Sequence, residues 1–289
     1  MSDVKTDADR IREGAKALEE QAARMADAAS TASTREDVTA TNKALPSANP
    51  DAPAQSDAQH TEDVAEMFGR MARWYDFQNR AFSLFLDCWW RRNLVRAVVP
   101  GPTKHVVDLA AGTLDVSIAL LRRYPELTVT ATDISEPMLR YGEEHKVRPG
   151  ERSRIKTMVA DARRMPLPDA CADAVTIAFG IRNVRPRMDA LREMHRLLVP
   201  GGRACILEFA PVSTPVFGPA YHWYLKNVMP KLAGLVSRSN NAFDYFAETI
   251  ETFPKPADFS AELREAGFDF VQHIPFTLGV ANIDIAVRG

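Results

Sequence analysis

Short apolar runs alternate with amphipathic stretches along most of the chain. The runs lie at 106–109, 127–132, 155–160, 174–179 and 204–209. Each has the length and character of a strand buried in a parallel sheet. The stretches between them have helical spacing, and the one at 188–198 is ended by Pro200-Gly201-Gly202. Strands that alternate with helices predict an α/β fold, with helices on both faces of a parallel sheet.

The alternation stops at Pro211, where an insert rich in aromatic and aliphatic side chains begins. This insert, 211–253, is expected to form a helical lid. A helix over 256–266 follows, and then two closing strands, 271–276 and 281–287, which are expected to pair antiparallel. The predicted fold is a Rossmann-like doubly wound sheet of about seven strands, mostly parallel, with a final antiparallel strand.

The first 60 residues differ from the rest of the chain. They contain no aromatic residue and are rich in Ala, Asp, Thr and Ser. Such a composition predicts a tail, 1–60, that is disordered or marginally helical. From Glu62 onward the composition changes, and Val64, Met67 and Phe68 have helical spacing. A single domain is therefore expected over 61–289, and its first helices either pack on the sheet or cover the ligand site.

Composition and charge exclude several classes of protein. The formal net charge of −2 argues against a general nucleic-acid binder. Cys88, Cys171 and Cys205 are far apart, so neither a disulfide framework nor a metal site is expected. No apolar run approaches the roughly 20 residues of a membrane span. The N-terminus resembles neither a secretory signal nor a transit peptide, so a cytoplasmic location is expected.

The loop after the first predicted strand indicates a ligand site. Residues 108–115 read Asp-Leu-Ala-Ala-Gly-Thr-Leu-Asp. The small residues around Gly112 allow a ligand to approach the backbone closely, and Asp115 is expected to cap the next helix. The second strand ends at Asp133, 21 positions after Gly112. In a doubly wound sheet an acid at that place can hold a ribose, so a nucleoside-binding βαβ unit is predicted.

Two nucleoside ligands suit such a unit. NAD requires several glycines that expose backbone amides to the pyrophosphate, whereas this loop has the single Gly112 followed by Thr113 and Leu114. An acid at the helix start, Asp115, would also repel a diphosphate. A nucleoside with a positive centre and no phosphate fits better, which favours S-adenosylmethionine over NAD.

The chain from about Val64 to Val287 resembles the UbiE-type ubiquinone/menaquinone biosynthesis C-methyltransferases. Each block is weak alone, but all occur in order over more than two hundred residues. The blocks are Tyr75-Asp76-x-x-Asn79-x-x-x-Ser83 followed by Trp90, the loop at 108–115, Phe179-Gly180-Ile181-Arg182-Asn183-Val184, Arg196-Leu197-Leu198-Val199-Pro200-Gly201-Gly202 with Glu208-Phe209, Ala247-Glu248-x-Ile250-x-x-Phe253-Pro254, and Ala266-Gly267-Phe268.

The resemblance implies S-adenosylmethionine as cofactor and assigns residues to it. They are Thr113 with Gly112 and Asp108 in the first loop, Asp133 for the ribose hydroxyls, and Asp161 with Ala162 for the adenine. The sequence departs from the family pattern at five positions, which include Gln78 in place of a methionine and Ala210 in place of a serine. Leu114 replaces a glycine, Ala178 stands where a serine is common, and Asp87 stands where a histidine is usual.

The resemblance also implies methyl transfer to a ring carbon of a prenylated quinol, with a demethylmenaquinol-type ring favoured. Arg182 would stabilise a developing oxyanion, and Tyr75 and Asn183 would position the ring hydroxyls. An ion pair with a loop acid is the alternative for Arg182, and packing within the helical cover is the alternative for Tyr75. Two alternatives remain for the whole chain. It could be a degenerate methyltransferase fold that serves as a binding or scaffold protein, or a methyltransferase of another small aromatic substrate.

The substrate implies a place in the cell. A prenylated quinol resides in the bilayer, so peripheral contact with an anionic membrane is expected. The stretch 211–243 combines apolar side chains with Lys226, Lys231 and Arg238, and it contains no acidic residue. A lid packed on the protein or a buried tunnel for the prenyl tail would have the same apolar content, but neither requires the absence of acids. That stretch is therefore the expected membrane contact.

Overall fold

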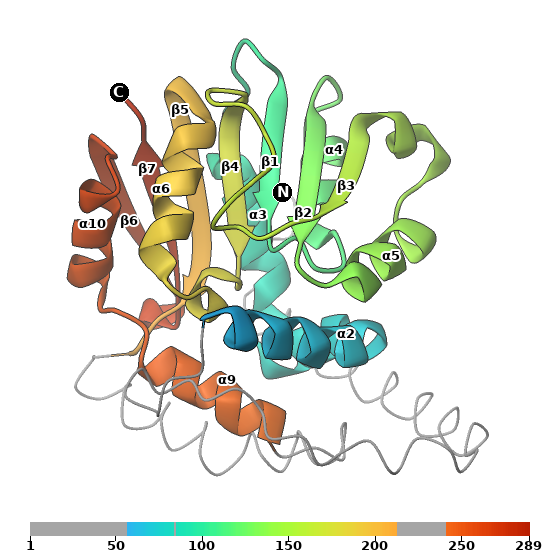
Figure 1. Cartoon of the computed structure of the whole chain (residues 1–289), viewed down its shortest axis with the longest axis vertical. Helices are drawn as coiled ribbons and strands as arrows, with labels where there is room; N and C mark the ends of the chain where they lie inside the picture. Colours follow the sequence, from blue (N-terminus) through green and yellow to red (C-terminus); the bar gives the residue numbers. More distant parts are fainter. Residues whose placement is uncertain (1–56, 84, 213–240) are drawn as a thin grey trace, which may run out of the picture.

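The structure is a computed structural model that describes residues 57–83, 85–212 and 241–289. The expected tail lies outside these ranges except for its last four residues, and so does most of the expected lid. The described chain forms a seven-stranded sheet in the order β3-β2-β1-β4-β5-β7-β6 (Figure 1). The strands are β1 His105–Leu109, β2 Thr128–Asp133, β3 Ile155–Val159, β4 Ala172–Ala178, β5 Leu198–Phe209, β6 Phe270–Phe276 and β7 Ala281–Val287.

The topology of the sheet confirms the predicted fold class. Strands β1 to β5 pair in parallel, and β7 runs antiparallel to both β5 and β6. The chain order reverses between β1 and β4, the place where doubly wound sheets bind ligands. Strand β5 begins six residues earlier than the predicted 204, because Leu198 already pairs with Ala172 before the Pro-Gly-Gly bulge.

Helices cover both faces of the sheet. One face carries α3 Leu86–Ala97, α4 Asp115–Arg123 and α5 Glu136–His145, and the other carries α6 Arg187–Leu197 and α10 Pro256–Glu265. Strand β1 has apolar side chains on both faces of the sheet. Val106 packs in the core on the α3 and α4 side, and Val107 and Leu109 pack in the core on the α6 and α10 side. Short 3₁₀ turns are η1 Pro149–Arg154, η2 Ile181–Asn183 and η3 Thr277–Gly279.

Two further helices lie along the edge where the parallel strands end, α2 Asp57–Phe82 and α9 Asn241–Glu251 (Figure 1). The helical spacing of Val64 and Met67 is confirmed, and both side chains are buried in a small cluster with Tyr245 of α9. Among the described helices, none is both long enough and apolar enough to cross a membrane.

The helix cap after β1 differs from the expectation. Leu114, and not Asp115, occupies the N-cap position of α4, and Asp115 is the first helical residue. Leu114 has φ 69° and ψ 20°, the left-handed conformation that the family's glycine adopts freely. Its side chain is fully buried. A Cβ added to Gly142 of α5 would lie 2.6 Å from Leu114 Cγ, so the absent side chain on α5 makes room for this leucine.

The strained backbone at Leu114 leads to a comparison of two variants. Leu114→Ala and Leu114→Gly both remove a buried side chain, which costs roughly 2–5 kcal/mol. Only glycine relieves the left-handed strain, which is worth about 1 kcal/mol. We expect the glycine variant to be the more stable of the two in urea denaturation and to keep S-adenosylmethionine affinity. An alanine variant as stable as the glycine variant would contradict this account.

A carboxyl group is buried in the centre of the sheet. Asp108 of β1 is 1% exposed and accepts hydrogen bonds from Ser117 Oγ and Thr176 Oγ1, both at 2.6 Å. Burial raises the pKa of Asp108 to about 6, although the two hydroxyl groups act in the opposite direction. Asp108 thus joins β1, α4 and β4 directly beneath the ligand loop.

The raised pKa of Asp108 predicts a pH dependence of stability. The folded protein binds this proton more tightly than the unfolded chain, so the unfolding free energy falls as pH rises from 3.8 to about 6. Asp108→Asn removes that decline. The stability of the variant relative to the natural protein should therefore be greater at neutral pH than at pH 4, by up to about 3 kcal/mol. An equal difference at both pH values in denaturant titrations would contradict the assignment.

Candidate functional site

A pocket lies where β1 to β4 end, the usual place for a ligand in a doubly wound sheet. Loops after the strands supply most of its wall, and Ile134, Met138 and Phe179 make much of that wall apolar. The predicted site residues that line it are Gly112, Asp133, Asp161, Ala162 and Asn183.

Asp133 connects the loops after β1 and β2. Its Oδ2 accepts from the backbone N–H of Gly112 (2.8 Å), and its Oδ1 accepts from the N–H of Ser135 (2.8 Å). Burial raises the pKa of Asp133, while these amides act to lower it. Each carboxylate oxygen retains a second lone pair. Because Asp133 also lines the pocket, it can accept from a ligand diol without losing its hold on the loops.

The backbone turns sharply at the ends of β1 and β4. Ala110 and Phe179 directly follow these strands, with φ of 47° and 58°, and Gly112 has φ 53°. A Cβ on Gly180 would lie 2.5 Å from the Cβ of Ala110, so the two loops approach each other too closely for a larger residue. Left-handed residues other than glycine are costly and concentrate at functional sites.

Asp161, expected to accept from the adenine amine, is held by a neighbouring arginine. Arg163 Nε donates to both Asp161 oxygens (3.0 and 2.9 Å), and its Nη2 donates to Oδ2 (2.6 Å). Burial acts to raise the pKa of Asp161, but the hydrogen bonds from Arg163 outweigh it and lower the pKa. The carboxylate is thus fixed in its ionised, accepting form at the pocket wall.

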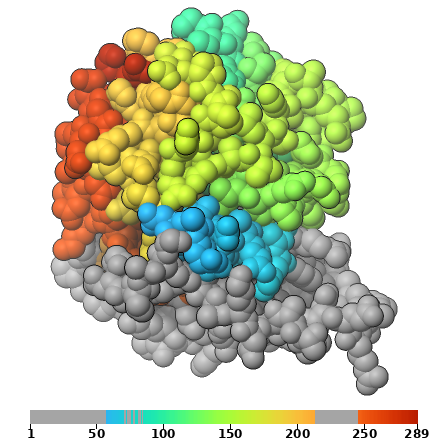
Figure 2. All heavy atoms as spheres, viewed as in Figure 1, coloured from blue at the N-terminus to red at the C-terminus, as the bar shows by residue number. Residues whose placement is uncertain are grey.

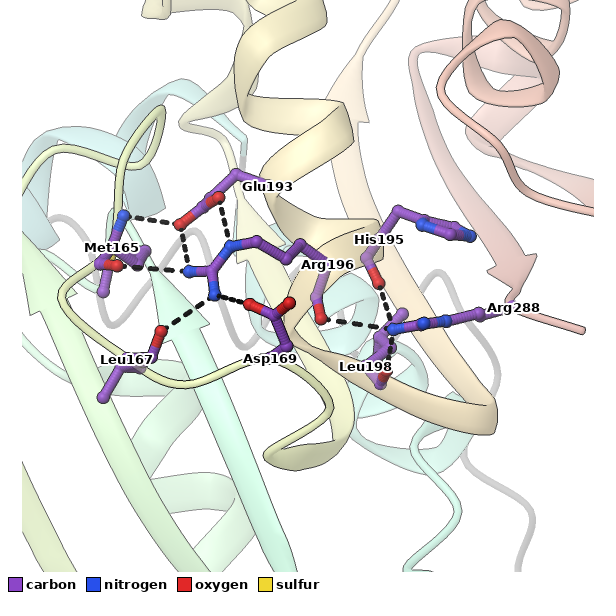
Figure 3. A network of polar contacts seen from close by, with 8 residues as sticks. All are labelled: Met165, Leu167, Asp169, Glu193, His195, Arg196, Leu198 and Arg288. Carbon is purple, nitrogen blue, oxygen red and sulfur yellow. Dashed lines mark hydrogen bonds and ion pairs between the residues drawn. The ribbon is translucent and has the colours of Figure 1, made fainter.

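The segment that follows Asp161 is anchored from α6 (Figure 3). The guanidinium of Arg196 donates to Glu193, to the carbonyl of Leu167 (2.9 Å) and to Asp169 (2.5 Å). Glu193 in turn accepts from the N–H of Met165 (2.6 Å). Arg288 donates to the carbonyls of His195, Arg196 and Leu198 at the end of the same helix. This network keeps the segment after Asp161 in place at the pocket wall.

Helix α2 lies against the strand-end loops (Figure 2) and lines one side of the pocket. Thr61, Val64 and Phe68 contribute its inner face to the pocket. Thr61 Oγ1 accepts from Arg163 Nη2 (3.0 Å), and His60 Nε2 donates to the carbonyl of Asn183 (3.2 Å). The sequence left open whether this helix packs on the sheet or covers the ligand site, and the structure shows that it packs on the strand-end loops and lines the pocket.

Further along, α2 is joined to the first loop through Lys146. The Lys146 ammonium donates to Thr113 Oγ1 (2.8 Å) and Asp115 Oδ1 (2.6 Å), and it pairs with Asp76 of α2. Thr113 Oγ1 itself donates to Asp76 Oδ1 (2.5 Å). The side chains of Thr113 and Asp108 therefore make contacts that hold this loop in place, and neither residue lines the pocket.

Arg182 forms a buried ion pair, the alternative that the sequence left open. Its Nη1 donates to Glu208 Oε1 (2.7 Å) and to the carbonyl of Phe179 (2.7 Å). The guanidinium lies over the rings of Phe209 and Phe246, 5.6 and 5.2 Å from their centroids. Its Nε is buried and has no hydrogen-bond partner among the described residues. Arg182 adjoins the pocket wall but does not line the pocket.

Asn183 lies where α2 and α9 meet the pocket. Its Oδ1 accepts from the hydroxyl of Tyr245 (3.1 Å), and its carbonyl accepts from His60. Burial raises the pKa of Tyr245 to about 12, so this phenol remains a donor near neutral pH. Asn183 also lines the pocket. The side chain of Tyr75, the third predicted catalytic residue, lies outside the described residues.

The departures from the family pattern are accommodated by their neighbours. Asp87 is buried, accepts from Ser83 Oγ (2.9 Å) and pairs with Arg91 (3.5 Å). Arg91 in turn lies over the ring of Phe179, 5.1 Å from its centroid. Ala178 is buried in the core. Together with the left-handed Leu114, these contacts preserve the pocket.

Sequence reasoning missed four residues that hold the site together: Lys146, Arg163, His60 and Tyr245. A local pattern could have identified Arg163, because an arginine two residues after an acid in a turn can donate several hydrogen bonds to that carboxylate. The others act across elements distant in sequence, and no local pattern identifies them.

Comparison with known proteins agrees with this geometry. The model of the ubiE/COQ5 methyltransferase family matches residues 55–288. A ubiquinone/menaquinone biosynthesis C-methyltransferase from Geotalea daltonii is 37% identical over 223 residues, covering 77% of this chain and 94% of that protein. A demethylmenaquinone methyltransferase from Thermus thermophilus is 39% identical over 222 residues, covering 77% of this chain and all of that protein.

A solved structure shares the fold. The S-adenosylmethionine-dependent methyltransferase from Thermotoga maritima superposes with a TM-score of 0.52 at 15% identity, over 80% of this chain and all of that one. The pocket at the ends of β1 to β4, its paired acids and the matches in sequence converge on one assignment. The chain belongs to the ubiE/COQ5 methyltransferase family and is an S-adenosylmethionine-dependent methyltransferase.

Proposed function

We propose that this enzyme methylates a ring carbon of a prenylated quinol, with a demethylmenaquinol-type ring favoured. The names of the relatives from Thermus thermophilus and Geotalea daltonii support this substrate class. The observation that carries the proposal is the position of Phe179. It lines the nucleoside pocket and contacts Phe209 (4.6 Å between centroids), so an aromatic wall adjoins the place where a methyl donor would lie.

The pocket residues fit the proposed cofactor. Asp133 offers lone pairs to the ribose diol, and Asp161 is held ionised for the adenine amine. Gly112 and Ala162 leave space beside them, while Thr113 and Asp108 support the loop from behind. S-adenosylmethionine supplies a methyl group already activated by its sulfonium, so the chain need only align the acceptor carbon with it.

Arg182 and Asn183 are proposed to act on the ring oxygens. Because Glu208 neutralises Arg182, we assign it a donor role and not that of a free cation. Its buried Nε lacks a partner among the described residues and would gain one as a quinol oxygen ionises. The Asn183 amide nitrogen would hold a second ring oxygen. Tyr75 keeps its proposed positioning role.

The substrate also implies where the enzyme works. A polyprenyl quinol stays in the bilayer, so we propose that the protein acts from the cytoplasmic side and contacts the anionic membrane peripherally. The stretch 211–243, expected to make this contact, lies largely outside the described residues.

Calorimetry tests the cofactor assignment. The natural protein should bind S-adenosylmethionine and not NAD. Asp133→Asn removes one acceptor oxygen and should weaken S-adenosylmethionine binding by about 1–3 kcal/mol, the cost of unmet buried partners. Thermal unfolding serves as the control for folding. An unchanged dissociation constant in a folded variant would remove Asp133 from the ribose site.

Expression in a host that lacks its own quinone C-methyltransferase tests the substrate. Mass analysis of extracted quinones should show the methylated product with the natural chain. Arg182→Lys keeps the charge but loses the planar donor, so it should reduce product formation while S-adenosylmethionine affinity in vitro stays unchanged. Cofactor binding without any methylated quinone would instead favour the scaffold alternative, or a different aromatic substrate.

A further inference from the structure

Two large apolar side chains are exposed at one corner of the domain. Trp89 of α3 is 42% exposed, and Leu278 of η3 is 65% exposed. The ring of Trp89 meets that of Phe276 edge-on, with centroids 5.0 Å apart. We call Trp89, Phe276 and Leu278 the apolar corner. Phe276 pairs with Ala281 opposite Phe209 of β5, so the corner lies at the strand-end edge that carries the pocket.

The local structure holds these side chains outward. Trp90, the neighbour of Trp89, is buried and donates from Nε1 to Thr277 Oγ1 (3.1 Å), which fixes α3 against the turn. Thr277 and Leu278 both have positive φ, 49° and 56°. Such strain is costly for residues other than glycine, and here it leaves a leucine in solvent. Burial within the described domain therefore does not account for this turn.

The turn of the apolar corner is fixed to the same packed side chains that form one wall of the pocket. Phe179 lines the pocket, and its ring lies 4.6 Å from that of Phe209. Trp90 meets Phe209 edge-on at 5.8 Å, and its Nε1 donates to Thr277 in the corner turn. The corner is therefore held in a defined position relative to the pocket.

The surface beside the corner is cationic. Arg92 and Arg96 follow Trp89 by three and seven residues, so the three share one side of α3, and both arginines are exposed. The acid in α3, Asp87, is buried against Ser83 and Arg91. An apolar tip with arginines one and two turns behind it matches the depth profile of a bilayer surface, with its apolar boundary and anionic headgroups.

We propose that the apolar corner inserts into the interface of an anionic lipid bilayer while Arg92 and Arg96 contact the headgroups. The bilayer then holds the substrate at the strand-end edge that carries the pocket. This inference rests on the proposed function, since only a membrane-held substrate requires such a contact. Trp89 and Leu278 supply apolar insertion, and the arginines supply selectivity for anionic lipid.

Vesicle co-sedimentation of the full chain tests the contact. The vesicles are phosphatidylcholine with or without phosphatidylglycerol. The corner variants are Trp89→Ser/Leu278→Ser and Arg92→Glu/Arg96→Glu. Phe270→Ser is the apolar control, because Phe270 is 56% exposed at the opposite end of β6. Lys104→Glu/Arg152→Glu is the charge control, because these exposed cations precede β1 and β3 at the opposite edge.

The natural chain and both controls should sediment with the anionic vesicles, and both corner variants should lose at least about tenfold in partitioning. Equal partitioning of corner and control variants would overturn the proposal. So would a dimer of the natural chain, seen by light scattering, that the corner variants dissociate without any vesicle binding.

Enzymatic readouts separate this proposal from the proposed function. The corner variants should bind S-adenosylmethionine and methylate a short-tailed, water-soluble quinol as the natural chain does. Their turnover of a long-tailed quinol in vesicles should fall about tenfold. If the natural chain methylates neither quinol while the corner variants alone lose vesicle binding, the proposed substrate fails and the membrane contact stands. A loss of short-tail activity in folded corner variants would also overturn the proposal, because a membrane contact has no effect on a water-soluble substrate.

Discussion

The carboxylate of Asp133 is the constraint on which the site depends. It accepts backbone N–H groups from the loops after β1 and β2, so it fixes the two segments that a nucleoside must contact together. Buried amides need acceptors, and a carboxylate supplies them strongly. The same group retains lone pairs toward the pocket. The carboxylate that joins the two loops is therefore also the group that we propose to bind the ribose.

Charged side chains then join the other segments of the pocket to one another. Arg163 fixes Asp161 and reaches α2, Lys146 joins α2 to the first loop, and Arg196 anchors the intervening segment from α6. These pairs are partly buried, so removing one partner leaves an uncompensated charge. They make α2 part of the site and not an independent layer.

The aromatic side of the site serves a different chemistry. Arg182 is neutralised by Glu208 and enclosed by Phe209 and Phe246, which leaves a directed donor in apolar surroundings. Phe209 also packs against Trp90 and against Phe179, which lines the pocket. The pocket thus has polar groups at Asp133 and Asp161 and an aromatic wall at Phe179.

The sequence by itself determined the succession of strands and helices along the chain and the acids at the ends of the strands. Period and polarity are local properties, so β1 to β4, Gly112, Asp133 and Asp161 could be placed from them. Only the tertiary structure decided that Leu114 can replace a glycine, because that depends on Gly142 of another helix. It likewise decided that Arg182 pairs with Glu208 and that Thr113 supports the loop from behind, since their partners are distant in sequence and meet only when the sheet closes.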